Sequence, residues 1–190
     1  MTPLDLAADL TRRLDDLHIP YVIGGSVAAS LVGEPRSTAD IDIAVAMTVE
    51  HVAPLLAAVA GDFYVPSDAA RHEAEQSTAF NLIDRRSALK VDLFVLGDDL
   101  LDRLQLERRQ SIELPIDPPR SVWVTSAEDV VLRKLRWFVD GGRASDQQCR
   151  DIVGVLRHQR GRLDEAYLDQ TATATGLISE LEQARLAAST

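Results

Sequence analysis

The spacing of apolar residues along the chain changes repeatedly between a helical and a strand-like pattern. Leucines recur at close to helical spacing from residue 4 to residue 17, which predicts an amphipathic helix that ends before Pro20. Further helical patterns cover residues 27–32, 48–61, 98–110 and all of the chain beyond residue 126. Short apolar or alternating runs, which predict strands, cover residues 21–24, 39–45, 63–66, 79–85, 89–96, 111–116 and 122–126.

The order of these elements indicates an α/β (α+β) fold. Strands and helices are mixed up to about residue 126 and only helices follow, which predicts a mixed-sheet core with a helical C-terminal part. We expect a core of residues 1–118 and a helical region of residues 119–190, either separate or packed as one domain. A chain of 190 residues is long enough to bury a sizeable hydrophobic core in both cases.

The composition limits which cellular compartment and which class of binding partner we expect. No apolar run approaches the roughly 20 residues that span a bilayer, and the start of the chain lacks the apolar core of a signal peptide. The single cysteine, Cys149, fits a reducing compartment. We therefore expect a cytoplasmic protein that does not enter the membrane. The net charge of −10 argues against a surface that coats nucleic acid broadly.

The charge is distributed unevenly along the chain. Residues 133–162 carry eight Arg or Lys and three Asp, a net charge of +5 that leaves −15 for the rest of the chain. This asymmetry indicates either a local basic face for an anionic ligand or an ordinary solvated helical surface. The pattern alone leaves both interpretations open.

Three aspartates interrupt strands that otherwise have the pattern of buried ones. On a strand, successive side chains point to opposite faces, so Asp40 and Asp42 share one face while their apolar neighbours share the other. Two carboxylates about 7 Å apart repel each other unless a cation lies between them, and oxygen ligands suit Mg²⁺. Asp92 interrupts a second strand, so the three side chains could hold one or two divalent ions. Each motif alone is more often a strand end or a loop that faces water.

A glycine-rich turn precedes the paired aspartates by thirteen residues. Gly24, Gly25 and Ser26 lie between a predicted strand and a predicted helix, of which Ser26 is the expected N-cap and Gly33 the expected end. Glycines let the backbone approach a ligand closely, and a helix N-terminus offers unpaired N–H groups to an anion. Most Gly-Gly pairs are simple turns, but here phosphate and metal ligands would converge.

The turn "GGS", the "DID" thirteen residues later and the isolated Asp92 together resemble the signature of the nucleotidyltransferase superfamily that includes DNA polymerase beta. The stretch "RSTADIDIAV" further resembles small prokaryotic members related to AbiE-type and MenT-type toxins, and residues 125–156 resemble their C-terminal helical segment. The resemblance covers roughly residues 18–160 and implies a mixed-sheet nucleotidyltransferase core.

The resemblance also implies roles for the matching residues. Asp40 and Asp42 would bind Mg²⁺ or Mn²⁺, and Asp92 would be a metal ligand that also helps to deprotonate the attacking hydroxyl. Gly25 and Ser26 would hold the triphosphate of a bound nucleoside triphosphate (NTP).

The loop ahead of the aspartates contains a further candidate. Thr38 matches a position at which the family places a polar group beside the nucleotide. We interpret Ser37 as a turn cap instead, and Arg36 either contacts phosphate or is a surface arginine.

The helix predicted to begin near residue 127 places Lys134 at the border of its apolar stripe, apart from the other cations. A lysine held against apolar surface loses hydration unless it meets an anion. That anion is either a bound triphosphate or Asp151 of the next helix, and a third alternative is that the lysine reaches solvent. Asp151 is the preferred helical acidic residue for nucleotide binding, because Asp146 fits the first turn of its helix. Two helix caps are expected, Ser126 with Asp129 and Ser145 with Gln148.

The resulting functional hypothesis is a metal-dependent transferase that moves a nucleoside monophosphate from an NTP to an acceptor hydroxyl and releases pyrophosphate. By resemblance, the acceptor would be the 3′ end of tRNA, for a toxin of a toxin–antitoxin system with a cognate antitoxin. A partner protein, as for antitoxin-type members, and an aminoglycoside hydroxyl are the alternatives. The basic residues 133–162 favour RNA.

Two other classes compete with this hypothesis. One is a degenerate, non-catalytic binding module, against which the presence of all three aspartates and Lys134 argues. The other is a phosphatase or related two-metal hydrolase. Such sites usually include histidine, and the four histidines here show no ligand spacing with the aspartates.

Overall fold

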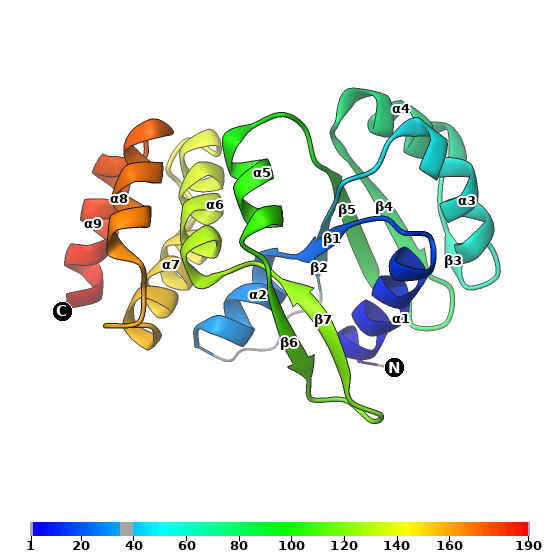
Figure 1. The fold of residues 1–190 in the computed structure, drawn as a ribbon, viewed down its shortest axis with the longest axis horizontal. Helices are drawn as coiled ribbons and strands as arrows, with labels where there is room; N and C mark the ends of the chain where they lie inside the picture. Colours follow the sequence, from blue (N-terminus) through cyan, green and yellow to red (C-terminus); the bar gives the residue numbers. More distant parts are fainter. Residues whose placement is uncertain (1, 35–39, 190) are drawn as a thin grey trace.

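The computed structural model describes residues 2–34 and 40–189, which form one mixed sheet surrounded by helices (Figure 1). The helices are α1 Pro3–Asp16, α2 Gly25–Val32, α3 Val49–Val59, α4 Ser67–Gln76, α5 Leu100–Glu107, α6 Ala127–Asp140, α7 Asp146–His158, α8 Glu165–Ala174 and α9 Ile178–Ser189. The strands are β1 Tyr21–Ile23, β2 Ile41–Val45, β3 Phe63–Tyr64, β4 Ala79–Asp84, β5 Lys90–Val95, β6 Gln110–Leu114 and β7 Arg120–Val124.

Within the described residues the sheet has the order β3-β4-β5-β2-β1-β7-β6. The pairs β2–β5 and β1–β7 are parallel and the other neighbours are antiparallel. The predicted mixed α/β architecture is therefore confirmed.

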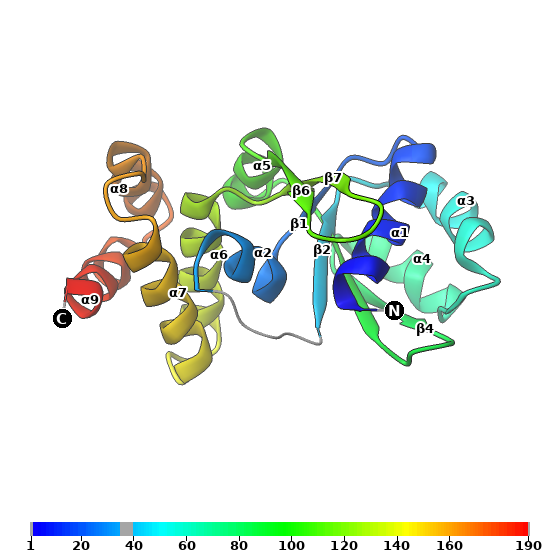
Figure 2. The same cartoon turned by 90° about the horizontal axis from the view of Figure 1, so that it is seen from below.

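The helices form layers on both faces of the sheet, as the view from below shows most clearly (Figure 2). Helices α1, α3 and α4 lie on one face, and α2 and α6 lie on the other. Helix α7 packs on α2 and α6, and α8 and α9 complete the C-terminal end of the molecule (Figure 1). None of the helices in the described part of the chain is both long and apolar enough to cross a membrane.

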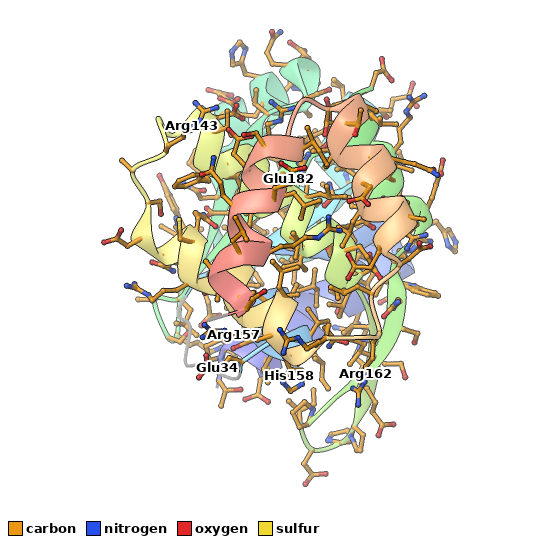
Figure 3. All side chains as sticks on the ribbon, turned by 90° about the vertical axis from the view of Figure 1, so that its left-hand side faces the viewer. Glu34, Arg143, Arg157, His158, Arg162 and Glu182 are labelled. Carbon is orange, nitrogen blue, oxygen red and sulfur yellow. The ribbon has the colours of Figure 1, made fainter. Side chains whose placement is uncertain are left out.

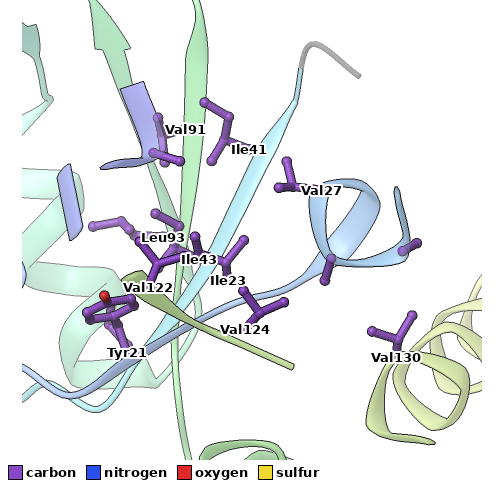
Figure 4. Close-up of a cluster of buried hydrophobic side chains, with 14 of the residues drawn as sticks. Tyr21, Ile23, Val27, Ile41, Ile43, Val91, Leu93, Val122, Val124 and Val130 are labelled. Carbon is purple, nitrogen blue, oxygen red and sulfur yellow. The ribbon is translucent and has the colours of Figure 1, made fainter. Parts of the chain in front are cut away.

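The core lies on the face of β2 and β5 that is opposite to the aspartates. Ile41 and Ile43 are fully buried, and so are Val91 and Leu93 on the neighbouring strand (Figure 4). Because side chains alternate along a strand, burying these four residues turns Asp42 and Asp92 to the other face. The predicted alternation of the two strands is confirmed.

Two local predictions differ from the structure. Helix α2 begins at Gly25 with Gly24 as its N-cap and no side-chain cap, so the prediction of Ser26 as N-cap is wrong. The reason is that Gly25 has a φ of +56°, which turns the chain out of β1 earlier than a capping serine would. Helix α4 was not expected because it buries little beyond Ala70 and Ala74, which give a weak apolar pattern.

The expected division at residue 118 stays a prediction. Strand β7 lies between β1 and β6 in the sheet, so the sheet itself continues to Val124. Both predicted helix caps are present. The Ser126 side chain accepts from the backbone N–H of Asp129, and the Ser145 side chain accepts from that of Gln148.

Candidate functional site

Two of the three aspartates lie side by side on adjacent strands. Asp42 on β2 is in register with Asp92 on β5, and because this pair is parallel their side chains share one face of the sheet. Asp40 directly precedes β2 and is exposed. The sheet topology therefore brings together carboxylates that are 50 residues apart in the sequence.

The glycine turn lies against the carboxylate of Asp42. A Cβ on Gly25 would lie 1.7 Å from Asp42 Oδ2, a distance that no side chain can occupy. The backbone N–H of Gly24 donates to the Asp42 carbonyl at 2.9 Å, and that of Ser26 donates to the Asp42 carboxylate. The predicted convergence of the turn and the aspartates is present, and it requires glycine at position 25.

Burial raises the pKa of Asp42, and the nearby charge of Asp92 raises it further. The backbone N–H of Ser26 and the positive charge of Lys134 act in the opposite direction. The ionised form of Asp42 is thus destabilised by the protein alone. A bound cation would relieve this repulsion.

Asp92 has one oxygen engaged and one available for a further ligand. Lys90, two residues earlier on β5, places its Nζ 2.8 Å from Asp92 Oδ2, and this contact raises the pKa of the lysine. Asp92 Oδ1 is buried and has no hydrogen-bond partner among the residues that the structure describes. Because a buried carboxylate oxygen is rarely left unsatisfied, Oδ1 fits the ligand atom of a divalent cation.

Within the described ranges, three or more His, Cys, Asp or Glu side chains nowhere gather closely enough to hold a metal ion by themselves. Mg²⁺ commonly binds to one or two carboxylates and completes its shell with water and substrate phosphates. Asp42 and Asp92 fit that mode. The metal site of three aspartates with Asp40 as a ligand stays a prediction.

Lys134 and Asp151 form a buried ion pair between α6 and α7. Lys134 Nζ lies 2.8 Å from Asp151 Oδ2 and 3.1 Å from Gln148 Oε1, and the two charged side chains are 3% and 6% exposed. Of the three alternatives for this lysine, Asp151 is the anion present and the solvent alternative is excluded. Asp146 lies exposed in the first turn of α7, as expected.

The glycine turn, strands β2 and β5 and helix α6 line a common pocket. Its walls are Gly24, Gly25, Asp42, Ala44, Phe94, Gln105, Thr125, Val130, Arg133, Lys134 and Trp137. Lys134 thus reaches the same pocket as Asp42 and Gly25, although its ammonium is paired with Asp151. The predicted roles of these residues in binding nucleotide remain predictions.

The sequence reasoning did not find the aromatic wall of the pocket. The Phe94 and Trp137 rings lie 6.0 Å apart between centroids. Phe94 follows Asp92 by two residues on the same face, a signal that the sequence did contain. Nothing in the helical pattern beyond residue 126 marked Trp137 as a pocket residue. Thr38, together with Arg36 and Ser37, lies outside the described residues.

Comparison with solved structures identifies the fold. No family model and no curated protein sequence matches the chain. The antibiotic-resistance factor ANT(2″)-Ia in solution aligns with a TM-score of 0.56 and 15% identity, over 96% of this chain and 98% of that one. The same factor in complex with adenylyl-2″-tobramycin gives a TM-score of 0.55 at 15% identity, covering 94% and 96%.

A third similar structure is an antigenic nucleotidyltransferase-like protein from Paracoccidioides brasiliensis. It aligns with a TM-score of 0.55 and 18% identity, over 95% of this chain and 91% of that one. The chain therefore has the nucleotidyltransferase fold over nearly its whole length. At these identities the similarity establishes the fold alone.

Proposed function

We propose that the protein is a metal-dependent nucleotidyltransferase that transfers a nucleoside monophosphate from an NTP to an acceptor hydroxyl. The observation that carries this proposal is the register of Asp42 with Asp92 directly against the Gly25 turn. Asp42 and the Gly25 turn line one pocket, to which β5, the strand of Asp92, contributes Phe94. The nucleotidyltransferase fold supports the same reaction class.

Each group of site residues has a separate role in the proposed reaction. The N–H groups at the start of α2 and the Lys134 ammonium would bind the triphosphate, and the aspartates would hold Mg²⁺. When bound, the metal would supply charge stabilisation for the attacking and leaving oxygens of an in-line displacement. Asp92 accepts the proton of the attacking hydroxyl. The O–P bond to the acceptor forms as the bond to pyrophosphate breaks, and pyrophosphate carries away the leaving electron pair.

The decisive test is transfer of label. The protein is incubated with each α-³²P-labelled NTP, Mg²⁺ and either total cellular RNA or total protein. We expect label in one acceptor pool and none with Asp42→Ala, whose fold is checked by circular dichroism. Near-wild-type transfer by that variant would refute the metal assignment, and magnesium-dependent NTP binding without transfer would favour the binding module.

For the acceptor we propose RNA, specifically the 3′ end of tRNA, as for a cytoplasmic toxin of a toxin–antitoxin system. The support is the resemblance of the "RSTADIDIAV" stretch and the net charge of +5 on residues 133–162. Arg157, His158 and Arg162 lie at one end of the C-terminal face (Figure 3), and Arg157 and His158 line one pocket with Glu34. Glu34 is six residues before Asp40, so this end of the surface is close in sequence to the proposed metal ligands.

Several of the basic residues are engaged within the protein. Arg157 donates to the carbonyls of Ala187 and Ala188 at the end of α9, and Arg143 pairs with Glu180. Arg150, Arg160 and Arg162 are exposed and have no ion pair or side-chain hydrogen bond to the described residues, so their charge is available to an anion. A hydroxyl of a partner protein or of a small molecule is the alternative acceptor. ANT(2″)-Ia, crystallised with adenylyl-2″-tobramycin, is a similar structure with a small-molecule product.

A further inference from the structure

The pocket beside Asp42 has two chemically different ends. One end holds the carboxylate of Asp42, the backbone of Gly25 and the ammonium of Lys134. The rest of the lining has Phe94 and Trp137 as its largest apolar side chains, beside the polar Gln105, Thr125 and Arg133. The first end suits a polyanion with its metal, and the second suits a planar, weakly polar group.

The two-residue repeat of strands β2 and β5 places both ends of the pocket on one face of the sheet. Ala44 and Phe94 follow Asp42 and Asp92 by two residues on their strands and are themselves in register, so they continue the same face of the sheet. Two residues of strand span about 7 Å. A ribose separates the phosphates of a nucleotide from its base by a comparable length. Ala44, which has a small side chain, lines the pocket between these residues.

One face of helix α6 forms the wall of the pocket that is opposite to β2 and β5. Val130, Arg133, Lys134 and Trp137 recur at spacings of three or four residues, which places them in one stripe. Lys134 is one turn before Trp137, so the cation and the aromatic ring follow each other along the pocket. The charges on this wall are held by partners on other helices, Arg133 by Asp102 and Lys134 by Asp151.

The aromatic rings are only partly covered by the protein itself. Phe94 and Trp137 are both partly exposed, whereas their neighbours Leu93 and Leu135 are buried. The centroids of their rings are 6.0 Å apart, the rings are inclined by 34°, and both residues line the pocket. Covering aromatic surface with a flat ligand ring is favourable, and base–aromatic stacking tolerates any base because each base has a π-face.

From this arrangement we infer that Phe94 and Trp137 form the binding site of the nucleobase, and that the triphosphate lies toward Gly25 and Lys134. The inference rests on the proposed function, since it assumes that the ligand is an NTP. It goes further by separating the pocket into a phosphate end and a base end. The rings bind the base by stacking, and therefore contribute to affinity for NTP but not for inorganic triphosphate.

The test compares NTP with inorganic tripolyphosphate, each with Mg²⁺, by titration calorimetry. The wild type is expected to bind NTP at least tenfold more tightly than tripolyphosphate, since stacking is typically worth about 1–3 kcal/mol per base. Trp137→Ala and Phe94→Ala should each weaken NTP binding about tenfold and leave tripolyphosphate binding within twofold. Trp137→Tyr should keep most of the NTP affinity, because it keeps a ring.

The matched control is Trp123→Ala. Trp123 is the other tryptophan of the chain, is 39% exposed on β7 and stacks with Arg109 instead of lining the pocket. This variant should bind both ligands as the wild type does. In a Trp123→Phe protein, whose remaining tryptophan is Trp137, NTP should quench the fluorescence and tripolyphosphate should leave it unchanged.

The outcomes separate the inference from the proposed function. Equal loss of NTP and tripolyphosphate binding in the Trp137 and Phe94 variants would overturn the inferred nucleobase-binding site, since the rings would then only support the fold. Tripolyphosphate binding as tight as NTP binding in the wild type would also overturn it, while the transfer reaction would stand. A wild type that binds neither ligand would overturn both.

Discussion

Lys90 and Asp92 form an ion pair on the same face of β5, with Lys90 Nζ 2.8 Å from Asp92 Oδ2. The charges of Asp40 and Asp42 also act on this lysine and help to raise its pKa. In the protein alone, Lys90 therefore neutralises part of the negative charge that a metal ion would neutralise under the proposed function. The lysine and the metal would then compete for the same carboxylate.

This competition predicts opposite effects of Lys90→Gln on stability and on metal binding. Without metal, the melting temperature should fall by a few degrees at most, because a 44% exposed lysine contributes little. The increase in melting temperature caused by Mg²⁺ should be larger than in the wild type. Thermal unfolding over a Mg²⁺ titration measures both, with Arg71→Gln on α4 as the control, and an unchanged Mg²⁺ response would contradict the competition.

Gly25→Ala should abolish NTP binding because a methyl group there collides with the Asp42 carboxylate. The control is Gly176→Ala. Gly176 also has a left-handed backbone, with a φ of +70°, but a Cβ there meets nothing within 4 Å. Both variants carry the strain of alanine at positive φ, about 1 kcal/mol or more, so the difference between them isolates the collision. Calorimetric NTP titration of both proteins is the measurement, and equal NTP affinities would contradict the prediction.

Lys134→Ala should destabilise the protein by about 3–5 kcal/mol, because it removes the cation of a buried ion pair from beside the Asp151 carboxylate. The double variant Lys134→Met/Asp151→Leu replaces both charges by apolar groups and should recover most of that loss. If Lys134 also binds the triphosphate, the double variant will fold but bind NTP weakly. Urea unfolding and NTP titration separate the two roles, and wild-type NTP affinity in the double variant would reduce Lys134 to a structural residue.

Much of this site follows from periodicity in the sequence. The alternation around Asp42 and Asp92 predicted both strands and the face of each carboxylate, because burying one face of a strand fixes the other. The partner of Lys134 could not be chosen from the sequence, since it depends on how α6 and α7 are rotated against each other. The same holds for Trp137, whose contact with Phe94 joins residues on a helix and a strand 43 positions apart.

Asp129 should make stability depend on pH. Burial raises the pKa of this carboxyl, despite hydrogen bonds from Tyr167 and Ser126 that favour its charge. The folded state thus holds the proton more tightly than the unfolded chain does. The resulting contribution to the free energy of unfolding is fully present below the ordinary pKa of an aspartate, and it is lost as pH rises through the raised pKa of the folded state. The melting temperature of Asp129→Asn, relative to the wild type, should therefore rise between pH 4 and pH 7.

The control for that experiment has the opposite sign. The hydrogen bond from Arg13 lowers the pKa of Asp62, so its contribution is present above the ordinary pKa and lost as pH falls. The melting temperature of Asp62→Asn, relative to the wild type, should therefore fall as pH rises to the ordinary pKa of 3.8 and stay nearly constant between pH 4 and pH 7. If the Asp62→Asn difference also rose between pH 4 and pH 7, the burial argument for Asp129 would be wrong.

The acceptor prediction depends on the three arginines that the fold leaves available. Arg150→Glu, Arg160→Glu and Arg162→Glu together should reduce transfer to RNA and leave magnesium-dependent NTP binding unchanged. Arg157 is excluded from this set because its guanidinium holds the last carbonyls of α9, so replacing it would disturb helix packing. A double reversal at Arg12 and Arg71, on helices α1 and α4 of the other face, is the control.

Salt distinguishes RNA from the other acceptors. Binding to the phosphates of RNA releases counterions, so RNA labelling by the wild type should fall steeply as ionic strength rises. The triple variant neutralises fewer phosphates and should show a shallower dependence, with a logarithmic slope smaller by about 0.7 for each single-strand phosphate that it leaves unneutralised. The measurement is initial RNA labelling at two or more salt concentrations, with NTP titration in parallel. Equal slopes and equal labelling would remove the charge argument for RNA. A wild type that labels protein but not RNA would place a partner-protein hydroxyl ahead of RNA, because such an acceptor has no phosphodiester backbone for the arginines to bind.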